Sequence, residues 1–126
     1  MDAMISRLRV WPIWKELQHF AISAACEDSS TSARAAEFCR GLARELGRKC
    51  KVTEEIWLFS QLDMPQLRAI AADEAAVAHL IIVSAHHSET LPKGVKSWIN
   101  LWLGKKTNHN TVLLGLFDPV YQGVST

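Results

Sequence analysis

The sequence lacks the marks of disulfide-rich and membrane-spanning proteins. Its 126 residues include only three cysteines, Cys26, Cys39 and Cys50, and none of them forms a C-x-x-C pair. An odd number of scattered thiols argues against a disulfide framework and predicts a reducing, cytoplasmic location. The longest uninterrupted apolar run is far shorter than the roughly 20 residues that a membrane helix needs, so we expect no membrane partner.

An excess of positive charge is also absent. Fourteen Lys and Arg stand against 13 Asp and Glu, which gives a formal net charge of +1, and no basic run is longer than Lys105-Lys106. Binding to a nucleic-acid backbone depends on a dense positive surface, so we expect no nucleic-acid partner. At this length the chain is predicted to form one domain with a hydrophobic core of its own.

The first 18 residues are predicted to form an N-terminal arm, with the domain proper at residues 19–126. The arm mixes arginines with apolar residues that include Trp11 and Trp14, and Pro12 would interrupt any helix there. We expect the arm to pack on this domain or on a neighbouring chain. An interfacial membrane helix is the alternative interpretation.

Residues 79–102 carry the clearest structural pattern, which is typical of a strand, a polar loop and a helix. Residues 80–83 are large, apolar and mostly β-branched, as in a strand that is covered on both faces. The next six residues, 84–89, contain no bulky aliphatic side chain, and Pro92 stands where the first turn of a helix begins. Ligands of open α/β sheets bind beyond the carboxyl ends of the strands, so we expect a site in this loop.

The rest of the chain alternates between strand and helix patterns. Apolar residues spaced at i, i+3, i+4, i+7 and i+8 from Ala35 predict an amphipathic helix that ends at Gly47. A second helix is predicted over residues 66–76, just after Pro65. Alternating strands and helices with long crossovers predict a parallel sheet with helices on both faces. The predicted strands are residues 20–26, 52–59, 80–83 and 111–117.

Four short segments carry a resemblance to a known family. They are Leu62-Asp63-Met64-Pro65, Ala78-His79-Leu80-Ile81-Ile82-Val83, Ala85-His86-His87-Ser88-Glu89-Thr90-Leu91-Pro92 and Val95-Lys96-Ser97-Trp98-Ile99-Asn100. Together they resemble the D-L-P turn, third strand, loop and helix of the flavodoxin-like NAD(P)H-dependent FMN reductases. The resemblance is strongest over residues 78–102. It implies a three-layer α/β, flavodoxin-like domain with parallel strands in the order 2-1-3-4, shortened so that the usual fifth strand and last helices are missing.

The resemblance also implies a site and an activity. FMN would bind at the carboxyl ends of the strands, with its phosphate at a helix N-terminus after the first strand. NAD(P)H would supply the hydride, and the chain would be a flavin or quinone oxidoreductase with no catalytic residue assigned. The implied cofactor-binding residues are Ser29, Ser30, Thr31, Ser32, His86, His87, Ser88, Glu89, Thr90, Phe117, Asp118 and Tyr121.

Several departures from the family pattern support an alternative function. Ala85 and His87 stand where the family has a proline and a tyrosine beside the flavin ring, and Glu27 and Asp28 adjoin the implied phosphate loop. A carboxylate at about 6 Å from a phosphate costs roughly 3 kcal/mol at an effective dielectric constant near 20. The dipole at a helix N-terminus stabilises a bound phosphate by only about 1 to 2 kcal/mol, which is less than this repulsion. The alternative is a non-enzymatic binding or oligomerisation module of the same fold that has lost the flavin.

The fourth strand is expected to be an uncovered edge. Such an edge invites pairing with another chain, so we predict a homo-oligomer that buries either this edge or the N-terminal arm. A receiver-like signalling domain is a third possibility because of Glu27 and Asp28, but residues 83–85 contain no phosphorylatable aspartate.

Metal binding and thiol chemistry are not expected. His86 and His87 are adjacent in sequence, so their side chains diverge in an extended loop; we expect no metal site and solvated histidines. A general acid or base role for His87 is the alternative. Cys26 is interpreted as structural, because Glu27 and Asp28 beside it would raise the pKa of its thiol.

Overall fold

The computed structural model describes residues 18–106 and 111–119. The predicted N-terminal arm, apart from Gln18, and the predicted site residue Tyr121 lie outside these residues. The elements are β1 (His19–Cys26), α3 (Ser29–Leu46), β2 (Lys51–Leu58), α4 (Phe59–Leu62), α5 (Pro65–Ala76), β3 (Leu80–Ser84), the 3-10 turn η1 (Ser88–Thr90), α6 (Lys93–Lys105) and β4 (Val112–Leu116).

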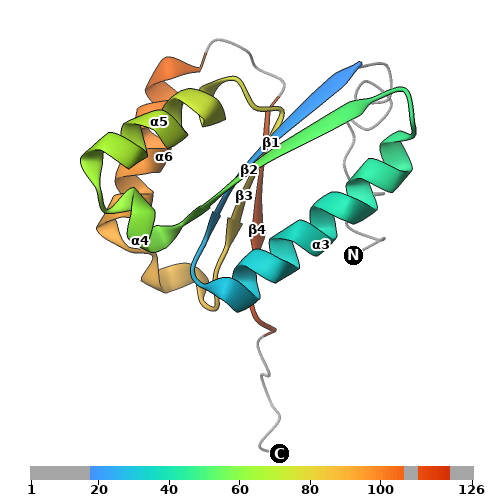
Figure 1. Ribbon diagram of the computed structural model, residues 1–126. Coiled ribbons are helices and arrows are strands. Elements are labelled where there is room, and N and C mark those ends of the chain that lie inside the picture. The colour runs from blue at the N-terminus through green and yellow to red at the C-terminus, as the bar shows by residue number, and fades with distance from the viewer. Residues whose placement is uncertain (1–17, 107–110, 120–126) are drawn as a thin grey trace, which may run out of the picture.

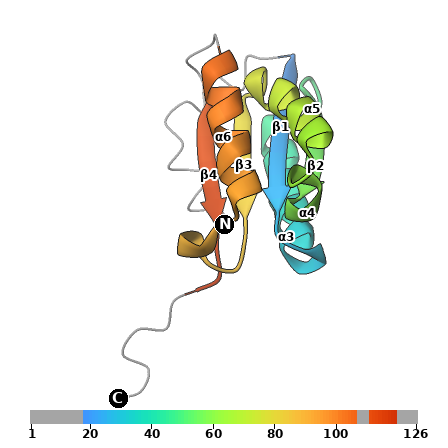
Figure 2. The ribbon, with the colours of Figure 1, turned by 90° about the vertical axis from the view of Figure 1, so that its left-hand side faces the viewer.

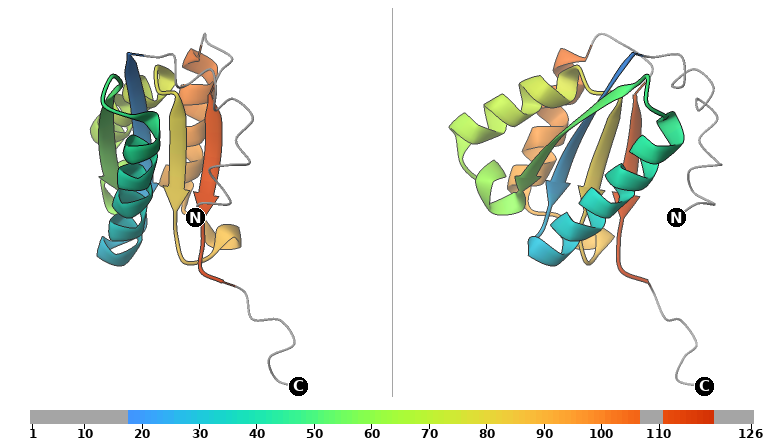
Figure 3. Two further views of the ribbon diagram at one scale, coloured as in Figure 1. Left: turned by 90° about the vertical axis from the view of Figure 1, so that its right-hand side faces the viewer. Right: turned by 45° about the vertical axis from the view of Figure 1, so that its right-hand side comes forward.

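The four strands form one parallel sheet in the order β2-β1-β3-β4 (Figure 1). Helix α3 covers one face of the sheet, and α4, α5 and α6 cover the other (Figures 2 and 3). This arrangement confirms the predicted three-layer α/β fold with strand order 2-1-3-4, which is the flavodoxin-like topology. None of the helices in the described part of the chain has the length and hydrophobicity needed to cross a bilayer.

The apolar run of β3 supplies both layers of the core. Leu80 and Ile82 pack with the α3 side, whereas Ile81 and Val83 pack with α5 and α6. Side chains alternate along a strand, so four consecutive large apolar residues are needed only where both faces are covered. The β3 residues from Leu80 to Ser84 are all buried, which confirms the prediction of a central strand.

Most predicted boundaries agree with the structure to within one or two residues. Gly47 ends α3 with φ 86°, a conformation that glycine adopts readily, and its N–H donates to the carbonyl of Ala43 at 3.2 Å. The prediction that Phe59 belongs to the second strand was wrong, because Phe59 begins the short helix α4 and is buried. The side chain of Gln61 accepts the N–H of Leu58 at 2.8 Å, which turns the chain out of the strand.

Candidate functional site

The loops after β1, β3 and β4 meet at the carboxyl edge of the sheet, at the bottom of Figure 1. Backbone hydrogen bonds continue to join them past the strand ends. The N–H of Glu27 donates to Ser84 O at 3.0 Å, and the N–H of Asp118 donates to His86 O at 3.1 Å. The three loops therefore form one continuous surface.

His86 lies between two carboxylates on this surface. Its Nε2 is 2.8 Å from Oδ2 of Asp28, and its Nδ1 is 2.8 Å from Oδ2 of Asp118. The hydrogen bonds to Asp118 and then Asp28 raise the pKa of His86, because both favour the protonated ring. The hydrogen bond from His86, followed by that from Arg34, lowers the pKa of Asp118.

The position of these three residues follows from the strand register. Cys26, Ser84 and Leu116 are aligned across β1, β3 and β4 and each ends its strand. Asp28, His86 and Asp118 each follow two residues later, so the register brings them to the same level. We call these three residues the clasp.

Arg34 reaches the clasp from α3 and satisfies groups from two strand ends. Its Nη1 donates to Oδ1 of Asp118 at 2.9 Å, and its Nη2 donates to the carbonyls of Ala85 at 2.7 Å and Leu116 at 2.9 Å. The planar guanidinium can donate to these three acceptors at once in a fixed geometry, which the ammonium group of a lysine could not reproduce. Arg34 is therefore committed to the protein's own acceptors.

Asp28 also caps helix α3. Its Oδ1 accepts the N–H of Thr31 at 3.0 Å and the hydroxyl of Ser30 at 3.0 Å, while its own N–H donates to Oγ1 of Thr31 at 2.9 Å. These contacts form a reciprocal capping box. The hydrogen bonds, above all the one from the Thr31 N–H, hold the pKa of Asp28 well below its usual range. The N-terminus of α3 thus carries an anion that belongs to the chain itself.

The residues present do not fit an FMN phosphate. Thr31, a predicted phosphate donor, is 1% exposed, and both its N–H and its hydroxyl are used by Asp28. A phosphate placed there would lie within about 6 Å of the carboxylate of Asp28, a repulsion of roughly 3 kcal/mol. Arg34 contacts Asp118 rather than this helix terminus, so it supplies no compensating contact at that point.

A small hollow lies beside the clasp. Its cavity volume is about 260 Å³, below the roughly 300 to 1,000 Å³ usual for small-molecule sites. Thr90, at the end of η1, does not line it, and neither do Ser29, Ser30, Thr31 and Ser32 at the start of α3. The hollow therefore brings together only part of the predicted site. It is lined by the predicted site residues His86, His87, Ser88, Glu89, Phe117 and Asp118, and by Pro119.

Glu27, Asp28 and His86 also offer possible metal-ligand atoms within 4.8 Å of one another. Both ring nitrogens of His86 already face carboxylates, so a cation would have to displace the proton from this ring. The expectation that no metal binds here stays a prediction. The expectation of two solvated histidines is confirmed for His87, which is exposed. For His86 it was wrong, because His86 joins the loops after β1 and β4 through Asp28 and Asp118.

Cys26 is buried at the end of β1, and burial is the main cause that raises the pKa of its thiol to about 11. The sequence-based reason was therefore incomplete. Asp28 contributes least among the causes, and a hydrogen bond with Ser32 and the charge of Arg34 oppose the rise.

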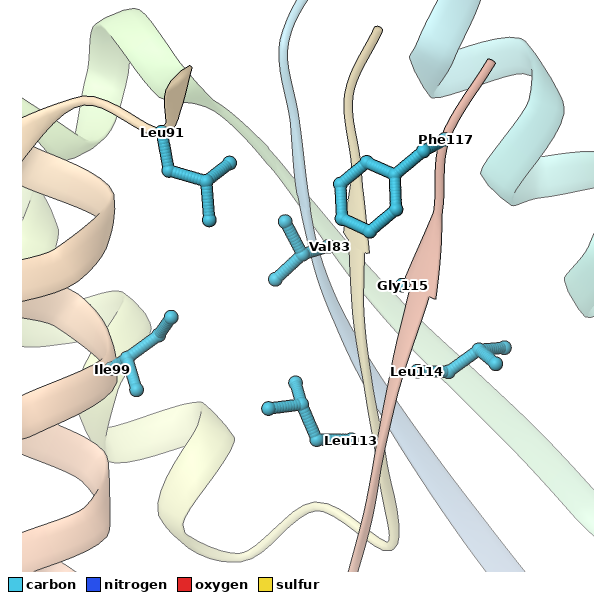
Figure 4. A pocket seen from close by; sticks show the side chains of 7 residues that line it. All are labelled: Val83, Leu91, Ile99, Leu113, Leu114, Gly115 and Phe117. Carbon is cyan, nitrogen blue, oxygen red and sulfur yellow. The ribbon is translucent and has the colours of Figure 1, made fainter. Parts of the chain in front are cut away.

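An apolar groove of about 280 Å³ runs between α6 and the outer strand β4. Figure 4 shows Leu91 and Ile99 on one side of it and Leu113 and Phe117 on the other, while Leu114 points to the opposite face of the sheet. Sequence reasoning predicted an uncovered β4 edge but not this groove. Val83 and Gly115 complete its lining.

The comparisons with known proteins add no family. The chain matches no protein-family model, no curated protein and no solved structure. The flavodoxin-like topology therefore stands on the strand order and helix placement described above.

Proposed function

We propose that this chain is a flavin-free binding module of flavodoxin-like fold. One observation carries the proposal: the carboxylate of Asp28 occupies the N-terminus of α3, the place where the fold's phosphate ligand would bind. The clasp and Arg34 form a hydrogen-bond network at the carboxyl edge of the sheet, in which the donors and acceptors of the protein pair with one another.

The competing hypothesis is an NAD(P)H-dependent FMN or quinone reductase. It would need free donors at the start of α3 and room for a flavin ring beside His86 and His87. The contacts of Thr31 and Ser30 with Asp28 and the size of the adjacent hollow both count against it.

FMN titration of the purified protein tests the proposal. We expect no saturable quenching of flavin fluorescence by the full chain, and no flavin absorbance in the protein as purified. Saturable FMN binding would overturn the proposal. Equal binding of FMN and riboflavin would also overturn it, and would show that the ring alone is recognised.

A charge variant tests whether the carboxylate of Asp28 prevents phosphate from binding at the N-terminus of α3. Asp28→Ser keeps a residue that caps helices well but removes the negative charge. It should raise the affinity for inorganic phosphate relative to the wild type. Asp73→Ser, which removes an exposed carboxylate from α5, is the matched control and should leave phosphate affinity unchanged.

A further inference from the structure

The two outer strands of the sheet are protected very differently. On β2 the charged side chains of Lys51, Glu54 and Glu55 are exposed. On β4 the five residues Val112–Leu116 carry no charge, and within the described residues β4 pairs with β3 alone. Charged residues on an edge strand prevent pairing with another chain, so β2 has this protection and β4 does not.

The backbone groups of β4 that are available for pairing can be identified from its bonds to the β3 side. The N–H of Val112 donates to the carbonyl just before β3 at 3.1 Å, and the carbonyl of Leu116 accepts from the amide just after β3 at 3.0 Å. Alternate residues of a strand point their backbone groups to opposite sides. Leu113 and Gly115 therefore direct their N–H and C=O groups towards the open edge.

We propose that two copies of this chain pair their β4 strands antiparallel, about a twofold axis at Leu114, to form one continuous sheet. This inference rests on the proposed function and names its partner as a second copy of the chain. Leu113 then lies opposite Gly115 of the partner subunit. Both residues have outward backbone groups, so they exchange hydrogen bonds in both directions, and the twofold axis repeats the pair.

The side chains favour this register. Leu113 is 53% exposed at the groove between α6 and β4. Gly115 presents no side chain, and a Cβ atom there would overlap the ring of Phe117. The ring of Phe117 therefore covers Gly115, and in the paired sheet Leu113 of one chain packs on this ring in the partner subunit. Directly opposite residues on one face of an antiparallel pair are close enough for this contact.

The remaining pairs are also compatible with twofold symmetry. Leu114 lies opposite its own copy, and Val112 lies opposite Leu116 of the partner subunit, all on the α3 face of the sheet. Because β4 carries no charged side chain, this register places no like charges opposite one another.

Sedimentation or light scattering over a range of concentrations tests the association. We expect the full chain to dimerise, and Leu113→Lys to weaken dimerisation about tenfold or more, because a charge is then placed against the partner's groove. Ile70→Lys is the matched control: Ile70 is an exposed apolar residue, 50% accessible, on α5, which packs on β1 rather than on β4. It should leave the dimer intact.

Disulfide cross-linking tests the register. Leu114→Cys should cross-link to its own copy under mild oxidation, because opposed residues of a non-hydrogen-bonded antiparallel pair lie within disulfide reach. Val112→Cys should not, since its opposite residue is Leu116 of the partner subunit. The three native cysteines are buried and should not compete.

Each outcome decides the inference. A wild-type chain that stays monomeric at all concentrations overturns it. A dimer that resists Leu113→Lys also overturns it and points to the N-terminal arm as the interface. A monomer that does not bind FMN would contradict the dimer but not the proposed flavin-free module, whose partner would then be another molecule. A dimer that binds FMN would support the β4 interface and contradict the flavin-free module.

Discussion

Nε2 of His86 lies 2.8 Å from Oδ2 of Asp28, although 58 residues separate them in sequence. The contact joins the loop after β3 to the cap of α3, and Asp118 on the other side of the ring extends the link to the end of β4. The chain therefore uses its ligand edge to hold its own loops together.

The pH dependence of stability should show this link. The folded-state pKa of His86 is raised above the ordinary 6.5, so its contribution is fully present below about pH 6.5 and is lost as pH rises through the raised value. The folded-state pKa values of Asp28 and Asp118 are lowered from 3.8. Their contribution is present above about pH 4 and is lost as pH falls through those lowered values.

Urea unfolding of wild type and His86→Gln across about pH 5 to pH 9 measures the effect of the histidine. We expect the variant to be less stable than wild type at the acidic end, with the difference shrinking towards the alkaline end. His87→Gln, at the exposed neighbouring position, should follow the wild type throughout. A constant difference between wild type and His86→Gln would contradict the link.

Arg34 should be important for stability in a way that an exposed arginine is not. Arg34→Met leaves the carbonyls of Ala85 and Leu116 without their guanidinium partner, and we expect a loss of about 2 kcal/mol in the free energy of unfolding. Arg34→Lys should recover only part of it, because an ammonium lacks the planar fork. Chemical denaturation gives both values.

Arg40→Met is the control for Arg34. Arg40 is also on α3, but its side chain is 60% exposed and pairs with Glu37 in a surface ion pair. We expect a change within about 0.5 kcal/mol. Equal losses in the Arg34 and Arg40 variants would show that the contacts of Arg34 add nothing beyond an ordinary surface ion pair.

The sequence predicted the fold where local patterns and tertiary burial agree. The run from Leu80 to Val83 correctly predicted a central strand because both faces of β3 are covered. The apolar spacing from Ala35 correctly predicted a helix because α3 buries one stripe of its side chains. Phe59 was misplaced, since an apolar residue after a strand is equally compatible with one more strand residue or a buried turn.

The clasp was harder to predict than the fold. Asp28, His86 and Asp118 were each noted, but their contacts depend on the register that aligns the ends of β1, β3 and β4. The strand ends predicted from the sequence lie two, three and one residues before them, so the equal spacing appears only with the strand ends that the structure defines. The Asp28 side chain points towards Thr31 and His86. This direction depends on the tertiary structure and cannot be inferred from the spacing of residues in the sequence.

Two glycines of α6 should respond in opposite directions to the same substitution. Gly94 lies against α4, and a Cβ there would be 2.5 Å from Oδ1 of Asp63 and 2.9 Å from the carbonyl of Leu62. We therefore expect Gly94→Ala to destabilise the protein by about 1 to 3 kcal/mol. A Cβ at Gly104 would meet nothing within 4 Å, so Gly104→Ala should stabilise the helix by about 0.5 kcal/mol. Thermal unfolding of the two variants checks both signs.

The thiols should be unreactive in the folded protein. Burial raises the pKa of Cys26 to about 11 and, as the largest cause, that of Cys39 to about 12, so little thiolate forms at neutral pH. Both side chains are also almost inaccessible, at 0% and 1% exposure. Labelling with a thiol-specific reagent should therefore be slow at neutral pH and become fast only in denaturant. Fast labelling of Cys26 under native conditions would mean that the end of β1 opens readily, which the hydrogen bonds of the clasp and of Arg34 argue against.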